Sequence, residues 1–370
     1  MRSSLHYDVI IIGGGLAGLS CALDLSRSKL RIALFEKYPY PRHKVCGEYI
    51  SNEILPYLKS LGADPFGQGA VAIDTFRMTD PRSGELQTKL PLGGFGISRY
   101  KLDHHLYDLI KTRVDVQIEQ VQDIRRDKER FIVTTSNGSD YESDVVIGAY
   151  GKRSILDKQL GRSFIQKQSP WLGIKAHYDY DHPENRVDLH HFKGGYCGLS
   201  EVEEKRVNAC FLVNYTSFKP YGKVELFQEA VMSQNPELKE FFDKATPLFD
   251  KPMSIAQISF QSKEAVYNGI PMIGDSAGLI HPLCGNGMAM AIHSAKILTD
   301  LIKHGLRGER LCAAYAQSWK ENFAQRLRTG RYLQFLLIKP QTNRLAFSIA
   351  RRLPGLVPKV VQKTHGEVLV

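Results

Sequence analysis

The sequence lacks several features that would assign it to a specialised class of protein. Its six cysteines are scattered and form no C-x-x-C pair, so neither a metal site nor a disulfide framework is expected, and a reducing cytoplasm fits best. It has no apolar run of about 18 residues, the length that spans a bilayer. The apolar stretch near the N-terminus leads into glycines rather than a cleavage site, so we expect no signal peptide.

The overall composition is typical of a globular protein with two connected domains. Of the 370 residues, 43% are hydrophobic and 24% are charged. A chain of this length is too long for one simple core. The net charge of +10 permits contact with anionic surfaces but does not identify one.

The N-terminal stretch predicts a dinucleotide site. An apolar run at residues 9–12 is typical of a strand buried in a parallel sheet. A second apolar run, Ile32–Phe35, ends in Glu36, whose carboxylate is placed to bind a ribose diol and would repel a 2′-phosphate. Between the two runs a helix follows a G-x-G-x-x-G loop and would point its N–H groups at a pyrophosphate; the glycines are Gly13, Gly15 and Gly18. The motif alone does not distinguish FAD from NAD.

A basic loop follows at residues 37–49, next to the predicted dinucleotide site. Its cations Lys37, Arg42 and Lys44 could hold a pyrophosphate by charge-assisted hydrogen bonds. Arg42 is better suited than Lys44 to bidentate binding. The alternative is a solvated basic loop without a ligand.

The middle of the chain predicts a second sheet. Short alternating strands at residues 67–96 and 171–260 indicate an antiparallel sheet, reached by two excursions from the parallel core. Such a sheet would cover the reactive end of a cofactor, because ligand sites favour domain interfaces. The patterns predict helices over 50–61, 98–112 and 224–245, and strands over 114–125, 130–136, 144–149, 172–178, 186–192, 196–201 and 207–215.

A second glycine-rich motif occupies residues 271–295, with the sequence PMIGDSAGLIHPLCGNGMAMAIHSA. It predicts a short strand, a compact loop and a helix that begins near Met288. Asp275 lies where its carboxylate could bind a polyol hydroxyl, and the N–H groups from Gly287 to Ala289 could face a phosphate or an electron-rich carbonyl. The alternative is a purely structural strand, loop and helix.

The segment 326–363 is basic and contains no Asp or Glu. Apolar residues interleave its cations, and Pro340 and Pro354 break it. Such a segment can rest on an anionic membrane surface, but we favour helices that pack on the main body with a solvated basic face. Nucleic acid is not an expected partner, because no recognised binding fold accompanies the charge. The cations are Arg326, Arg328, Arg331, Lys339, Arg344, Arg351, Arg352, Lys359 and Lys363.

Together these motifs resemble the flavoprotein superfamily typified by para-hydroxybenzoate hydroxylase, and within it the geranylgeranyl reductase family. The resemblance rests on GGGLAG with Glu36, PRHKVCGE, Arg99 with Asp103, GAYGKRS and GDSAGLIHPLCGNGMAMA, and it extends to about Asp300. It implies a mixed α/β fold, with a Rossmann-like FAD-binding domain, an inserted antiparallel-sheet substrate domain and C-terminal helices. We expect the FAD-binding domain at 1–70, 98–165 and 261–325, the substrate domain at 71–97 and 166–260, and a basic helical segment at 326–370.

The resemblance also implies FAD as the cofactor and a role for each matching residue. Glu36 would bind the adenosine ribose, Arg42 and Arg99 the pyrophosphate or ribityl region, and Asp275 the ribityl hydroxyls. Cys46 matches the cysteine of the reductases' K-x-C-G motif, near flavin and substrate, and is our candidate catalytic residue; the alternative is a small buried packing residue. The residues expected beside the isoalloxazine are Gly285, Asn286, Gly287 and Met288.

The chain departs from the resemblance on the substrate sheet. Reductases usually carry Y-x-W-x-F-P there, whereas residues 194–200 are GGYCGLS, in which Tyr196 is our candidate substrate-binding residue. The W-x-W-x-I-P of flavin-dependent halogenases is also missing, so halogenation is not expected. Tyr150 stands where aromatic hydroxylases have an aspartate, which argues against that branch.

We therefore expect an FAD-dependent oxidoreductase acting on a hydrophobic small molecule, whether polyprenyl, polyketide or aromatic. Hydroxylation through a flavin hydroperoxide and reduction of a carbon–carbon double bond stay open, because K-x-C-G favours the reductase and the missing aromatic segment counts against it. With no second G-x-G-x-x-G, NAD(P)H would bind only transiently as electron donor. The alternatives are a flavoprotein electron carrier without its own substrate and, less favoured, an NAD-dependent dehydrogenase. The expected location is cytoplasmic, with the membrane's inner face as the candidate site of peripheral contact.

Overall fold

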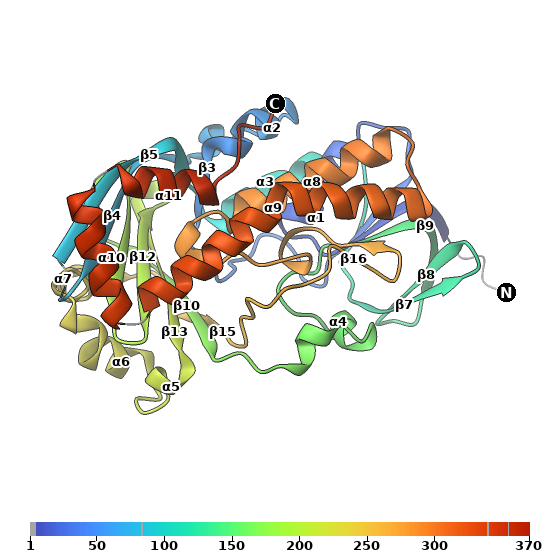
Figure 1. The fold of residues 1–370 in the computed structure, drawn as a ribbon. Coiled ribbons are helices and arrows are strands. Elements are labelled where there is room, and N and C mark those ends of the chain that lie inside the picture. Colours follow the sequence, from blue (N-terminus) through green and yellow to red (C-terminus); the bar gives the residue numbers. More distant parts are fainter. Residues whose placement is uncertain (1–4, 83, 339, 354) are drawn as a thin grey trace.

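The computed structural model describes residues 5–82, 84–338, 340–353 and 355–370. Two large sheets lie at opposite ends of the molecule, and a row of helices runs along one side of both (Figure 1). This arrangement confirms the predicted mixed α/β fold class.

The first sheet has six strands and carries the N-terminal motif. β1 (Leu5–Ile12) pairs in parallel with β2 (Ile32–Phe35) and β9 (Asp140–Gly148), so the carboxyl ends of these strands meet at one edge. The first helix, α1 (Leu16–Leu25), packs between α3 (Arg99–Ile110) and α8 (Gly287–Lys303). The remaining strands, in the order β6-β2-β1-β9-β8-β7, are β6 (Asp115–Gln117), β7 (Val121–Asp127) and β8 (Arg130–Thr135).

The second sheet has nine strands, and most neighbours are antiparallel as expected. One pair, β4 with β11, is parallel, which the alternating pattern could not reveal. The order is β14-β10-β13-β12-β11-β4-β5-β3, with β15 on β10. The strands are β3 (Tyr49–Ser51), β4 (Val71–Asp80), β5 (Gly84–Gly96), β10 (Trp171–Asp179), β11 (Arg186–Phe192), β12 (Gly195–Glu201), β13 (Arg206–Asn214), β14 (Thr246–Pro247) and β15 (Met253–Ile255).

Three predicted elements differ from the observed ones. The helix expected over 50–61 begins late, because Tyr49–Ser51 forms β3 and pairs with the end of β5. The strand expected over 114–125 is divided into β6 and β7, and the helix expected over 224–245 into α6 and α7. The domain boundaries stay a prediction. The shorter elements are α2 (Leu55–Ser60), α4 (Ile155–Gln159), α5 (Tyr215–Phe218), α6 (Val224–Ala230), α7 (Pro236–Lys244), β16 (Val266–Tyr267) and β17 (Ile270–Pro271).

The C-terminal segment forms helices that cover the nine-stranded sheet (Figure 1). These are the end of α9 (Gly308–Ile338), α10 (Pro340–Arg352) and α11 (Leu356–Thr364), and both α10 and α11 contact β5. Phe347 of α10 is buried against the sheet. The predicted break at Pro354 and the cation Lys339 lie outside the described residues. Within the described residues no helix has the length and apolar content needed to cross a membrane.

Candidate active site

A cavity of about 1520 Å³ extends between the two sheets. It exceeds the roughly 300–1,000 Å³ of a typical single-ligand site, so it has room for a cofactor and a second molecule. Most of the predicted site residues line it, although they come from segments far apart in the sequence. They are Gly13, Gly15, Glu36, Lys37, Arg42, Cys46, Arg99, Tyr196, Asp275, Gly285, Gly287 and Met288.

The glycine loop forms one end of this cavity. Gly13 has φ +111°, and a Cβ there would lie 2.3 Å from the carbonyl oxygen of Ala149, so the tight turn requires glycine. A Cβ at Gly15 would instead fit without a clash, in van der Waals contact with Arg99 Nη2 at 3.8 Å and Lys44 Nζ at 3.9 Å. No side chain among the described residues caps α1. The uncapped N–H groups and the two cations therefore face each other across a gap that suits a pyrophosphate.

Arg99 and Lys44 share one buried carboxylate, that of Asp103. Arg99 donates to it through Nε and Nη2, both at 2.7 Å, and Lys44 Nζ donates at 2.8 Å. Burial alone would raise the pKa of Asp103, but the two cations outweigh burial and lower it. Two positive charges against one negative charge leave the cluster with a net positive charge. An anionic pyrophosphate would neutralise that charge.

Arg42, predicted to bind the pyrophosphate or ribityl region, lies beside Glu36 and Tyr38 in this structure. Its Nη2 donates to Glu36 Oε1 at 2.7 Å, and its guanidinium stacks over Tyr38. The Glu36 carboxylate also accepts from the backbone N–H of Gly14 at 2.9 Å. Lys37 Nζ lies over the Tyr38 ring too, 4.5 Å from its centroid. In this structure the neighbours of Gly15 are thus Lys44 and Arg99, and the role of Arg42 at the pyrophosphate stays a prediction.

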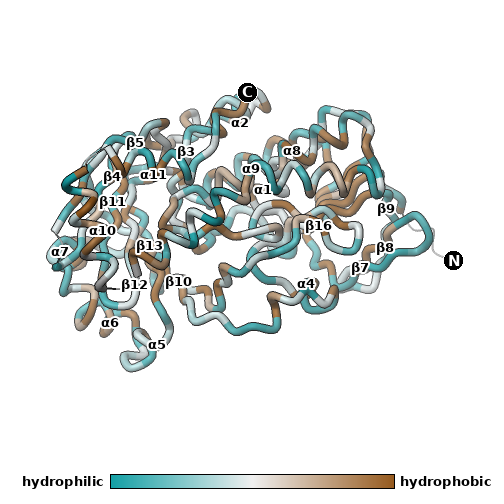
Figure 2. The backbone as a smooth tube through the Cα atoms, viewed as in Figure 1, coloured by the Kyte–Doolittle hydropathy of each residue, from teal (hydrophilic) through white to brown (hydrophobic). Residues whose placement is uncertain are grey.

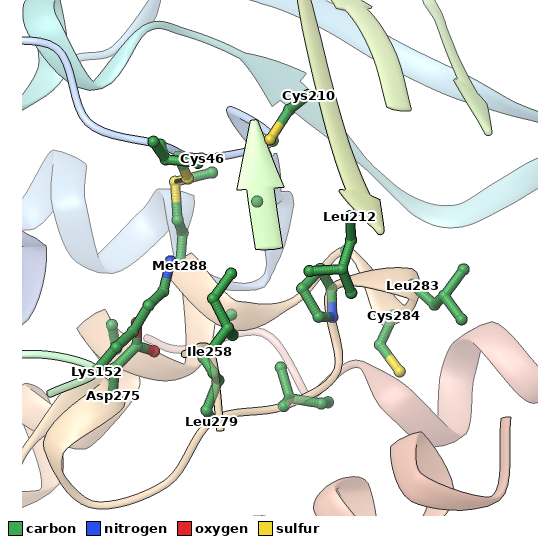
Figure 3. A pocket seen from close by; sticks show the side chains of 18 of the residues that line it. Cys46, Lys152, Cys210, Leu212, Ile258, Asp275, Leu279, Leu283, Cys284 and Met288 are labelled. Carbon is green, nitrogen blue, oxygen red and sulfur yellow. Dashed lines mark hydrogen bonds between the residues drawn. The ribbon is translucent and has the colours of Figure 1, made fainter. Parts of the chain in front are cut away.

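Asp275 lies on the other side of the glycine loop from Glu36, and it is close to Lys152 (Figure 3). Lys263 Nζ donates to the carbonyl oxygens of both residues, at 2.7 and 2.8 Å, and so holds the two segments together. Burial lowers the pKa of Lys263 to about 8, although nearby carboxylates partly offset the shift. The Asp275 side chain is partly exposed and lines the cavity, where it is available to a polyol.

The predicted isoalloxazine segment divides into two parts. Gly285, Gly287 and Met288 line the cavity at the start of α8. Asn286 does not, because its side chain is buried and donates to the carbonyl oxygen of Thr364 at 2.8 Å. The structure therefore ties Asn286 to the C-terminal segment, and its predicted contact with the cofactor stays untested.

Cys46 and Tyr196 lie on the apolar side of the cavity. The Cys46 thiol lies 3.4 Å from Met288 Sδ, and the two side chains point toward each other in Figure 3. Tyr196, on β12, is 4% exposed, and its hydroxyl has no hydrogen-bond partner among the described residues. A buried hydroxyl without a partner costs free energy, so this group suits a polar atom of a ligand. The apolar walls here include Leu212, Ile258, Leu279 and Leu283.

Sequence reasoning missed an ion cluster behind this wall. Glu48 is fully buried, pairs with Lys175, and lies 2.7 Å from His177 Nε2. Burial alone would raise the pKa of Glu48, but Lys175 and His177 outweigh it and lower the pKa. Glu48 also accepts from the backbone N–H of Arg99 at 2.7 Å. The cluster fixes the basic loop to β10. Lys175 and His177, two ionisable side chains within the predicted strand 172–178, were the available signal.

Residues 6–326 match the family described as FAD binding domain. The chain belongs to this family. The gap at Gly15, the net positive cluster around Asp103 and the carboxylates of Glu36 and Asp275 at its two sides fit the phosphates and hydroxyls of FAD.

The flavoprotein is similar to two enzymes with different reactions. It is 28% identical over 324 residues to a digeranylgeranylglycerophospholipid reductase of Sulfolobus acidocaldarius, covering 78% of this chain and 67% of the relative. It is 25% identical over 328 residues to a 3-hydroxybenzoate 6-hydroxylase of Klebsiella oxytoca, covering 78% of each. The flavoprotein is an FAD-dependent oxidoreductase of a family that contains reductases and hydroxylases.

Solved structures share the fold of this flavoprotein. The flavin-dependent brominase Bmp2 superposes with a TM-score of 0.80 at 19% identity, covering 97% of this chain and 93% of that one. PqsL, a probable FAD-dependent monooxygenase from Pseudomonas aeruginosa, superposes with a TM-score of 0.73 at 17% identity, covering 93% of this chain and 100% of that one. These similarities confirm the predicted fold of an FAD-binding protein.

Proposed function

We propose that this flavoprotein reduces a carbon–carbon double bond in a hydrophobic small molecule, using electrons from NAD(P)H. The observation that carries the proposal is the position of Cys46 on the cavity wall, 3.4 Å from Met288 at the start of α8. Bound FAD would supply the hydride for such a reduction. The chain's own residues would hold the cofactor, orient the substrate and supply a proton.

The proton at Cys46 Sγ is the one we assign to the reaction. Saturating a double bond requires a hydride on one carbon and a proton on the other. Cys46 is half-buried and lines the cavity together with apolar side chains, so its thiol would be within reach of a substrate bound there. Tyr196, whose buried hydroxyl has no partner among the described residues, would orient the polar end of the substrate.

NAD(P)H would bind transiently on the polar side of the cavity. The cavity lining near Asp275 includes the cations Lys152, Arg153 and Lys158, and their charges suit an anionic donor.

We also propose that the protein lies peripherally on the inner face of the membrane. The support for this is the exposure of cations along its C-terminal helices.

Hydroxylation is the second candidate function. The relative from Klebsiella oxytoca is named as a hydroxylase, and its identity to this chain is close to that of the reductase. Such a reaction would use the same cofactor site and the same apolar cavity, with oxygen as a further reactant.

One experiment distinguishes the two. The purified full-length protein is reduced with NADPH under anaerobic conditions, followed by the flavin absorbance bands, and then given a prenyl alcohol or a phenol with and without air. Reduction predicts a product heavier by two hydrogens without oxygen. Hydroxylation predicts a product heavier by one oxygen, formed only in air. A protein whose flavin bleaches with NADPH but converts neither substrate class would support an electron carrier.

A further inference from the structure

The three C-terminal helices expose an unusual number of large apolar side chains. Among the described side chains from 332 to 356, seven large apolar ones are between 38% and 66% exposed. Single exposed apolar residues are normal on protein surfaces, whereas clusters mark interaction sites. We call these seven the apolar rim: Tyr332, Phe335, Leu336, Leu345, Ile349, Leu353 and Leu356. In Figure 2, α10 carries brown, hydrophobic stretches at the edge of the molecule.

Part of the apolar rim also lines the cavity. Leu336 of α9, Leu345 and Ile349 of α10, and Leu356 of α11 face the cavity and are exposed at once. Side chains that contact both the cavity and the solvent lie at the mouth of the cavity. The cavity that holds Cys46 therefore opens between three helices, through apolar side chains.

Exposed cations lie on the same helices as the apolar rim. The segment 326–363 has no acidic residue. Among the described side chains, the exposed cations of this segment do not lie within ion-pair distance of a carboxylate; they are Arg328, Arg331, Arg351, Arg352, Lys359 and Lys363. Arg326 is the exception, because it is buried and paired with Glu53 at 3.1 Å.

We propose that the apolar rim inserts into an anionic lipid bilayer and that the substrate reaches the flavin from that bilayer through the mouth between α9, α10 and α11. The delivery step rests on the proposed function, whereas the docking does not. Apolar side chains flanked by unpaired cations are the combination that anionic lipid surfaces bind. A second copy of this chain fits less well, since a two-fold interface would place the same cations against each other.

The substrate that this path selects is an amphiphile with a long apolar chain. Beyond the flavin side, the cavity continues along apolar side chains from β4 and β11, such as Met78 and Leu189, to Val357 and Val361 of α11. A compact polar substrate would leave this length unfilled. A chain dissolved in lipid can enter it without first exposing its CH₂ groups to water, which is unfavourable.

Vesicle binding of the full-length flavoprotein tests the docking. Tyr332→Ser with Leu353→Ser removes two rim side chains that do not line the cavity. The matched control is Tyr215→Ser with Leu226→Ser. These two side chains are 50% and 48% exposed and lie on the other side of the nine-stranded sheet. With vesicles of phosphatidylcholine and phosphatidylglycerol, we expect the rim variant to bind at least about ten-fold more weakly and the control to bind like the parent. Replacing phosphatidylglycerol by phosphatidylcholine should weaken the parent similarly.

Two outcomes would overturn the docking. One is equal vesicle binding by parent, rim variant and control at matched flavin content. The other is a lipid-free dimer, seen by light scattering, that the Tyr332→Ser, Leu353→Ser variant converts to a monomer. That result would assign the surface to a second copy.

Transfer of cis-parinaric acid from vesicles into the cavity tests the path from the bilayer to the flavin. We expect slower transfer in the rim variant but unchanged uptake from solution, and equal transfer rates would refute the path. None of these readouts needs turnover, so a failed reduction assay leaves them interpretable.

Discussion

Cys46 Sγ lies 3.4 Å from Met288 Sδ, although 242 positions separate the two residues. The contact joins the basic loop after β2 to the first turn of α8. The K-x-C-G motif, which contains Cys46, lies next to the segment expected beside the isoalloxazine. Two motifs that lie far apart in the sequence therefore meet at the cavity wall.

Replacing Cys46 should impair turnover while leaving the cofactor bound. If its thiol supplies the proton, Cys46→Ala should lower kcat by about 10²-fold or more, with little change in KM. Cys210→Ala is the matched control, because Cys210 also lines the cavity but lies on β13 (Figure 3). Steady-state kinetics at equal flavin content check this. A Cys46→Ala enzyme as fast as the parent would reduce Cys46 to a packing residue.

Filling the gap at Gly15 should remove FAD. The backbone φ of Gly15 is −87°, so a larger residue is compatible with the fold, but its side chain would occupy the space before Arg99 and Lys44. Gly15→Val should therefore yield a folded protein without flavin bands. Gly355→Ala, at an open position far from the glycine loop, serves as control. Normal flavin content in a folded Gly15→Val protein would refute the glycine-loop site.

Lys44 and Arg42 of the basic loop should differ in their effect on FAD affinity. Lys44→Met leaves Arg99 and Asp103 as a neutral pair, so the pyrophosphate would lose a charged hydrogen-bond donor worth about 1.5–3 kcal/mol, or roughly ten- to hundred-fold in Kd. Arg42→Met should cost less, because Arg42 binds Glu36. Titration of the apoprotein with FAD measures both. A larger loss in the Arg42 variant would contradict this order and favour Arg42 as the residue that binds the pyrophosphate.

The buried Glu48 should matter more for stability than for cofactor binding. Glu48→Gln leaves the fully buried Lys175 without its carboxylate, which typically costs about 3–5 kcal/mol in the free energy of unfolding. The double variant with Lys175→Met should recover much of that loss, since no uncompensated charge remains. Urea unfolding of the three proteins checks the pattern. A double variant less stable than Glu48→Gln would contradict it.

Buried histidines should make the protein less stable in mild acid. Burial lowers the pKa of His281 to about 3, so between pH 6.5 and 3 the unfolded chain binds a proton there that the folded protein does not. The contribution of neutral His281 to the free energy of unfolding is complete above pH 6.5 and is lost as the pH falls towards 3. His281→Asn should make the dependence of unfolding free energy on pH shallower by about 1.4 kcal/mol per pH unit near pH 5. His104→Asn on the exposed face of α3 is the control, and parallel slopes in parent and His281→Asn would disprove the prediction.

The sequence by itself was enough for the elements whose cause is local. The strand, glycine turn and helix from β1 to α1 follow from an apolar run and from glycines within a few positions of one another. β2 and β11 have the predicted bounds, because their patterns depend on neighbouring residues only. Membership of an FAD-binding family followed from the same local motifs.

Only the tertiary structure decided the features that join distant segments. Tyr49–Ser51 is a strand because β5 offers it a hydrogen-bonding edge, against a local helical pattern. Lys44 rather than Arg42 lies before Gly15, since Glu36 attracts the arginine and Asp103 the lysine. Asn286 points to Thr364, and the basic C-terminal segment lines the cavity with one side while its cations face outward. Spacing in the sequence cannot specify these contacts, because each depends on how two separately folded elements approach one another.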